Sequence, residues 1–153
     1  MAVKPIPDGY HTVTPYLTVD DPGAVIDFLK KAFDATETYA MRDSSGKIQH
    51  AEVKVGDSML MLGGARGEWT ARPGNFYLYV EDVDAVYKKA VAAGGKSLRE
   101  PANQFYGDRH GAVTDSQGNS WWMATHVEDV SPEEVERRAQ QQHVQTPTAE
   151  ATK

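Results

Sequence analysis

Hydrophobic positions along the chain switch between the period of a strand and the period of a helix. Residues 13–19 alternate, with Val13, Pro15, Leu17 and Val19 on one face and polar residues on the other, which predicts a half-buried strand. Asp20-Asp21-Pro22 then supplies a helix N-cap and a first-turn proline. The stripe that follows predicts an amphipathic helix, and its apolar members are Val25, Phe28, Leu29, Ala32 and Phe33.

Three more strands are predicted after this helix, at residues 36–42, 48–55 and 58–62, the last two joined by a tight Gly56-Asp57 turn. The first unit therefore reads β-α-β-β-β. A second unit has the same order, with a strand at 76–80 and a helix from Asp82 that Gly94-Gly95 ends. A short strand near 97–100, a loop at 101–109 and strands near 111–115 and 120–126 complete it.

The two units also have similar amino-acid sequences. Residues 14–25 match residues 75–86 at an offset of 61, and residues 56–61 parallel residues 118–123 at an offset of 62. Two copies are too few for a solenoid, so a pseudo-twofold pair of half-domains is the economical interpretation. We expect an α+β fold of two βαβββ modules with a shared interior in which a ligand would lie.

The predicted organisation is one domain with irregular and polar ends. A lead-in at 1–11 precedes the first module at 12–64, a linker at 65–74 and the second module at 75–127. Ser131-Pro132-Glu133-Glu134 starts a predicted C-terminal helix within 128–140, and the Gln-, Thr- and Pro-containing tail at 141–153 is predicted to be disordered.

Composition narrows the classes of function. The chain has 153 residues, a net charge of −6 and no cysteine, which argues against nucleic-acid or anionic-membrane partners and excludes disulfides and thiolate chemistry. The N-terminus has no apolar run of the kind that a signal peptide or membrane span needs. A cytoplasmic protein is the default expectation.

Several short segments, in their order along the chain, resemble the sequences of one superfamily. They are His50-Ala51-Glu52-Val53, Gly56-Asp57-Ser58, Tyr79-Val80-Glu81-Asp82, Phe105-Tyr106-Gly107-Asp108-Arg109 and Trp121-Trp122-Met123-Ala124-Thr125-His126. With them the chain resembles the vicinal oxygen chelate superfamily of glyoxalases, bleomycin-resistance proteins and extradiol dioxygenases, and within it the PhnB-like subgroup. The resemblance implies a half-open mixed β-barrel or cleft and a homodimer.

Enzymes of this superfamily usually hold one divalent metal on the first and last strands of each module. The resemblance maps those positions to Thr14, Leu60, Asn75 and Trp122, none of which is a competent ligand. We therefore expect no metal or other cofactor. An alternative is a metal-dependent lyase, isomerase or dioxygenase with relocated ligands drawn from His50, Glu52 and His126.

Strand alternation points to a binding surface instead, because it places aromatic and polar side chains on the faces opposite the helices. The candidate ligand-binding residues are Tyr16, His50, Glu52, Tyr77, Tyr79, Tyr106, Arg109, Trp122 and His126. His110 is predicted to be a solvated loop residue. The leading hypothesis is sequestration or transport of a small aromatic or amphipathic molecule, and a structural or regulatory dimer with a filled cleft is a further alternative.

Overall fold

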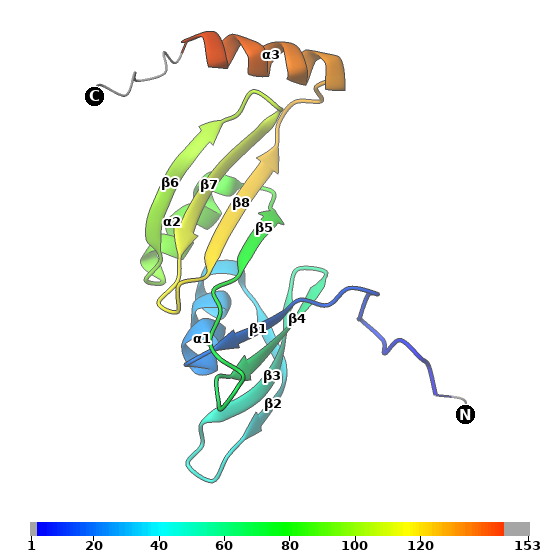
Figure 1. The fold of residues 1–153 in the computed structure, drawn as a ribbon, viewed down its shortest axis with the longest axis vertical. Coiled ribbons are helices and arrows are strands. Elements are labelled where there is room, and N and C mark those ends of the chain that lie inside the picture. Colours follow the sequence, from blue (N-terminus) through cyan, green and yellow to red (C-terminus); the bar gives the residue numbers. More distant parts are fainter. Residues whose placement is uncertain (1–2, 146–153) are drawn as a thin grey trace.

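A computed structural model describes residues 3–145 and contains two four-stranded mixed sheets with three helices (Figure 1). The first module contains β1 (Tyr16–Val19), α1 (Pro22–Phe33), β2 (Thr36–Arg42), β3 (Ile48–Val55) and β4 (Ser58–Gly64). The second contains β5 (Asn75–Tyr79), α2 (Val83–Ala92), β6 (Lys96–Asn103), β7 (Asp108–Thr114) and β8 (Ser120–His126), and α3 (Pro132–Gln145) follows it.

Both sheets have the same strand order. It is β1-β4-β3-β2 in the first and β5-β8-β7-β6 in the second, with the first strand of each parallel to its neighbour and the other pairs antiparallel. This repetition confirms the predicted pair of βαβββ modules. The sheets do not close into a barrel, and β1 and β5 are each left at a sheet edge in the middle of the elongated molecule (Figure 1).

Helices α1 and α2 begin in the same way. The Asp21 side chain accepts a hydrogen bond from the Ala24 backbone N–H at 3.1 Å, and the Asp82 side chain accepts one from Ala85 at 3.0 Å. Each bond satisfies a donor that the first helical turn leaves unpaired. The predicted apolar stripe of α1 faces the core, as expected from its helical spacing.

A single hydrophobic core joins the modules, because α1 and α2 pack against each other. At its centre Trp121 of β8 is 1% exposed and stacks on Phe76 with 4.6 Å between ring centroids. Phe28 and Phe33 of α1 contact the same indole at centroid distances of 6.3 and 5.8 Å. Burying one large ring among side chains of both modules ties the two halves together.

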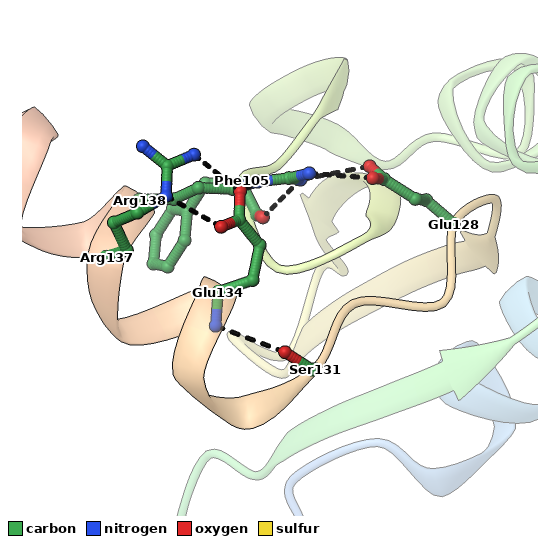
Figure 2. A network of polar contacts seen from close by, with 6 residues as sticks. All are labelled: Phe105, Glu128, Ser131, Glu134, Arg137 and Arg138. Carbon is green, nitrogen blue, oxygen red and sulfur yellow. Dashed lines mark hydrogen bonds and ion pairs between the residues drawn. The ribbon is translucent and has the colours of Figure 1, made fainter.

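Helix α3 is held mainly by charged groups (Figure 2). The Arg138 guanidinium contacts Glu128 and Glu134, each at 2.7 Å, and donates to the Phe105 carbonyl at 3.1 Å. Ser131 accepts a hydrogen bond from the Glu134 backbone N–H at 3.3 Å, as the predicted cap requires. The helix is thereby fixed to the connection between β6 and β7.

Several predicted boundaries are wrong. Strand β1 begins at Tyr16, because Val13 is 81% exposed and has nothing to pack against. The predicted loop at 101–109 is too long, because β6 continues through Pro101 to Asn103 and β7 begins at Asp108, which leaves only residues 104–107 between them. An edge strand tolerates Pro101 because its outer N–H groups have no strand partner.

At the C-terminus, α3 continues to Gln145 rather than stopping at residue 140, through a run of Ala and Gln that favours helix. The rest of the predicted tail, residues 146–153, lies outside the described residues. Within residues 3–145, no helix combines the length and the apolar character that crossing a membrane requires.

Candidate functional site

Each sheet has a face turned away from the helices, and the predicted binding residues fall on these faces in two groups. Tyr16, His50 and Glu52 lie on the first sheet, and Tyr77, Tyr79, Trp122 and His126 lie on the second, with Tyr106 beside the second group. The core residues alternate with them along the same strands. The side chains that strand alternation predicts for a binding surface therefore lie on the helix-free faces of the two sheets.

Asp108, the first residue of β7, organises the second group. It is 4% exposed, and its Oδ2 accepts hydrogen bonds from the Tyr77 hydroxyl at 2.9 Å and the Tyr79 hydroxyl at 3.0 Å. Its Oδ1 lies 2.9 Å from His126 Nδ1, and the other ring nitrogen of His126 lies 2.9 Å from Asp129. One buried carboxylate thus fixes two tyrosines and a histidine.

The protonation states follow from these contacts. Burial by itself would raise the pKa of Asp108, but hydrogen bonds from His126, Tyr77 and Tyr79 outweigh it and leave that pKa below its ordinary value. Hydrogen bonds to Asp108 and Asp129 raise the pKa of His126, which favours the imidazolium. Burial and the Asp108 hydrogen bond raise the pKa of Tyr77, so its hydroxyl stays a donor.

His110 contradicts its prediction as a solvated loop residue, since it is buried on β7 beneath the aromatic cluster. Its Nε2 lies 3.5 Å from Arg99 Nη1 and its Nδ1 lies 3.1 Å from the Tyr106 hydroxyl. Because arginine only donates, we assign the proton of the neutral ring to Nδ1, facing Tyr106. Burial and the nearby Arg99 lower the pKa of His110, which favours this neutral form.

The corresponding cluster on the first sheet is smaller. The Tyr16 hydroxyl lies 3.3 Å from His50 Nδ1, and His50 Nε2 lies 3.8 Å from a Glu52 carboxylate oxygen. The Tyr16 ring covers Gly63 of β4 so closely that a Cβ there would lie 2.5 Å from the tyrosine oxygen. The lack of a side chain at Gly63 therefore leaves room for the Tyr16 ring on the sheet.

Two hollows adjoin these faces. A groove of about 780 Å³ lies between the modules, where β5 from Phe76 to Tyr79, with Val80 after it, faces Pro15 and Phe33 of the first module. A cavity of about 350 Å³ lies over the first sheet. It is lined by Tyr16, Thr18, Gln49, Gly63, Gly64, Arg66 and Trp69.

Four residues of the site are absent from the candidates predicted from the sequence. Asp108 and His110 stood in or beside the predicted loop, and Arg66 and Trp69 stood in the predicted linker. A tryptophan and an arginine three residues apart in a Gly-containing segment were the available signal. The predicted site residue Arg109 lies on the helix side instead, where its Nε and Nη2 contact the Asp84 carboxylate of α2 at 2.7 and 2.8 Å.

The register of the strands corrects one position in the mapped metal site. Tyr16 pairs with Met61 and Tyr77 pairs with Trp122, so the counterpart of Trp122 is Met61. Leu60 is wrong for this role, because it is 6% exposed and faces the core. A slip of one residue moves a side chain to the opposite face of a sheet.

The donor chemistry does not fit the metal that this superfamily's enzymes usually hold. The four positions carry Thr14, Met61, Asn75 and Trp122, which offer neither a carboxylate nor an imidazole, and Asn75 Oδ1 already accepts from the Trp122 indole at 2.9 Å. The relocated set is not assembled within one chain either, because His126 lies on the other sheet from His50 and Glu52. Across residues 3–145, no three or more His, Asp or Glu side chains are grouped as metal ligands.

Comparison with known proteins agrees with this architecture. Uncharacterized proteins of Mycobacterium bovis and Mycobacterium tuberculosis are 33% identical over 135 residues, covering 81% of this chain and 89% and 79% of theirs. Among solved structures, TioX from Micromonospora sp. ML1 superposes with a TM-score of 0.67 at 22% identity, covering 76% of this chain and 99% of TioX. A PhnB protein from Bacillus cereus gives a TM-score of 0.61 at 19% identity, covering 75% and 99%.

These structural neighbours share the fold. A family model described as the Glyoxalase/Bleomycin resistance protein/Dioxygenase superfamily matches residues 10–123, which include both modules up to the middle of β8. The chain belongs to the glyoxalase/bleomycin resistance protein/dioxygenase superfamily.

Proposed function

We propose that this protein binds a small aromatic or amphipathic molecule on its helix-free sheet faces and sequesters or carries it without metal chemistry. The observation that carries the proposal is the fixed, uncovered tyrosine pair of β5. Tyr79 is 67% exposed although its hydroxyl is bonded to the buried Asp108, and Tyr77 beside it is bonded to the same carboxylate. The two rings meet edge to face at 5.4 Å.

This arrangement suits binding because the tyrosines are ordered before a ligand arrives. A ring held by its hydroxyl loses little rotamer freedom on contact, which removes part of the entropic cost of association. Its exposed apolar face gains when a ligand excludes water from it. Tyr77 and Tyr79 also line the groove between the modules, which offers a concave site next to them.

A thermal-shift screen tests the proposal with amphipathic drugs, quinones and thiol conjugates. A ligand of the folded state should raise the melting temperature with concentration, by the equivalent of about 2.7 kcal/mol at a hundredfold excess over Kd. Tyr79→Ala should lose the shift, and Val91→Ala, which removes an exposed side chain on α2, should keep it. Absence of a shift with every class would contradict the proposal and favour a structural dimer.

We also propose that the protein is a homodimer. The outer edge of β5 has no strand partner within residues 3–145, and exposed edges of this kind pair with other chains unless they are covered. The resemblance to a superfamily whose members commonly complete their clefts with a partner supports the same state. Analytical ultracentrifugation should give twice the chain mass of 16.8 kDa, and a monomer at micromolar concentration would refute it.

Metal analysis separates this proposal from a metalloenzyme with ligands drawn from His50, Glu52 and His126. Protein purified without chelator should contain substoichiometric zinc, nickel, manganese and iron. One equivalent of any of them, lost in Glu52→Gln or His126→Gln, would overturn the metal-free proposal and favour the lyase, isomerase or dioxygenase alternative.

A further inference from the structure

The linker between the modules forms a small hairpin. The Arg66 N–H donates to the Trp69 carbonyl at 2.8 Å, and the Trp69 N–H donates to the Arg66 carbonyl at 2.9 Å. Gly67 turns the chain with a φ of +52°. Residues that exchange both backbone hydrogen bonds project their side chains to the same side, so the guanidinium and the indole are presented together.

Both ends of this hairpin are fixed to β1. The Ala65 N–H donates to the Val19 carbonyl at 2.8 Å, and the Arg72 N–H donates to the Thr18 carbonyl at 3.0 Å. The hairpin therefore has a defined position over the first sheet, although its side chains are exposed. This anchoring holds Arg66 and Trp69 in the lining of the cavity of about 350 Å³.

The lining of that cavity combines aromatic rings with a single charge. Tyr16 and Trp69 supply the rings. The Tyr16 ring lies against Gly63 of β4, which has no side chain, so the cavity wall at that position is backbone. Arg66 is the one charged residue among the lining residues, which include no Asp or Glu. The Thr18 hydroxyl adds a neutral hydrogen-bond donor.

Arg66 is also unlike most arginines of this chain. Arg42, Arg109 and Arg138 each contact a carboxylate at 3.3 Å or less. In the described part of the chain the Arg66 guanidinium contacts no carboxylate within ion-pair distance, despite the net charge of −6. A guanidinium that keeps its planar fork free beside an aromatic wall is suited to bind a planar anion.

We propose that this cavity binds a planar aromatic carboxylate, with its ring against Tyr16 and Trp69 and its carboxylate on Arg66. The inference rests on the proposed binding function and names the ligand class of the first sheet. The second sheet is unsuited to the same ligand, because its tyrosines surround the anionic Asp108. The two halves of the molecule would thus differ in the charge that they accept.

Calorimetry with 2-naphthoate tests this, with neutral 2-naphthalenemethanol as the matched ligand that lacks the charge. Naphthoate should bind more tightly than the alcohol, and Arg66→Gln should weaken naphthoate by about tenfold to a hundredfold, as expected for a lost charge-assisted hydrogen bond. Arg66→Lys should recover part of the affinity, since it keeps the charge without the fork. Arg72→Gln removes the same charge nearby, outside the cavity lining, and should change the affinity little.

Trp69→Leu provides a second readout, because naphthoate should quench tryptophan fluorescence in the parent protein and much less in this variant. Equal affinities for naphthoate and the alcohol, or unchanged binding in Arg66→Gln, would overturn the inference. If naphthoate fails while neutral aromatic ligands still shift the melting temperature through Tyr79, the inference is wrong and the proposed function stands. If no aromatic compound binds, both are wrong.

Discussion

Asp108 is the residue on which the second sheet face depends. Its carboxylate is nearly excluded from water, which would be costly without compensation, and three side chains supply that compensation. A buried carboxylate is stabilised only while all of its hydrogen-bond donors are in place, because a partly satisfied buried network is costly. Any change to Asp108 should therefore be felt at Tyr77, Tyr79 and His126 together.

Asp108→Asn should lower the pKa of His126 toward its ordinary value near 6.5. The variant keeps the shape of the side chain but removes the charge that stabilises the imidazolium. A histidine-selective NMR titration measures the change directly. Asp129→Asn removes the other, solvent-exposed carboxylate and should have a smaller effect; an unchanged His126 pKa in Asp108→Asn would contradict this account.

The same histidine gives stability a pH dependence of known sign. Because the folded-state pKa of His126 is raised, its stabilisation is complete below about pH 6.5, the unfolded value, and is lost as pH rises through the folded value. The stability advantage of the parent protein over His126→Gln should be constant in mild acid and shrink at alkaline pH. Thermal melts of both proteins across this range measure it, and an advantage that grows with pH would refute it.

At the scale of elements, α3 differs from α1 and α2 because ion pairs hold it rather than an apolar face. Arg138 joins Glu134 on its own helix to Glu128 before it and to the Phe105 carbonyl (Figure 2). The guanidinium groups of Arg137 and Arg138 lower the pKa of Glu134 to about 2, so the helix keeps these pairs in mild acid. Salt should weaken them, because exposed charges are screened.

Arg138→Met should release α3 from the rest of the second module. Amide hydrogen exchange within residues 132–142 should become several-fold faster, whereas exchange in β7 should change little. Arg137→Met is the matched control, since Arg137 contacts Glu134 of its own helix and none of the anchoring groups outside it. Equal exchange rates for α3 in both variants would show that Arg138 does not anchor the helix.

Local patterns in the sequence predict most elements and fail where tertiary pairing decides. The apolar stripe of α1 and the alternation of β5 depend on neighbours in the chain, so they predict the buried side of α1 and the shared face of Tyr77 and Tyr79. Pro101 resembles a loop signal, but its place at a sheet edge makes it compatible with β6. Because residues 101–109 are predicted as a loop, Asp108 and His110 are not assigned to a strand face, and Asp108 is not identified as the centre of the tyrosine and histidine cluster.

At the scale of the whole molecule, the modules behave as one folding unit if their shared core is intact. Trp121 is the largest side chain at that junction and contacts rings from both modules. Outside the core, the Gln117 side chain accepts a hydrogen bond from the Asp21 backbone N–H at 3.0 Å, and Lys89 pairs with Asp34 at 2.6 Å. These polar links are exposed and add less than the core does.

Trp121→Ala should cost about 3–5 kcal/mol of unfolding free energy, as large-to-small changes in a packed core do. It should also broaden the denaturant transition or divide it in two, as the modules lose their joint packing. Trp122→Ala, one residue along on the opposite face, should cost less and keep a single transition. Similar losses for both variants would argue against a core shared between the modules.

The hairpin at residues 66–69 lies in the linker between the modules, and within residues 3–145 it has no counterpart in the second half of the repeat. Every strand and helix of one half has a counterpart that must satisfy the same packing, so selection for folding restricts both copies. The linker is free of that restriction, since its side chains lie outside the core. If the adjoining cavity binds the proposed ligand, related proteins should differ in ligand preference most along this short stretch, and grafting it between them should transfer that preference without refolding either half.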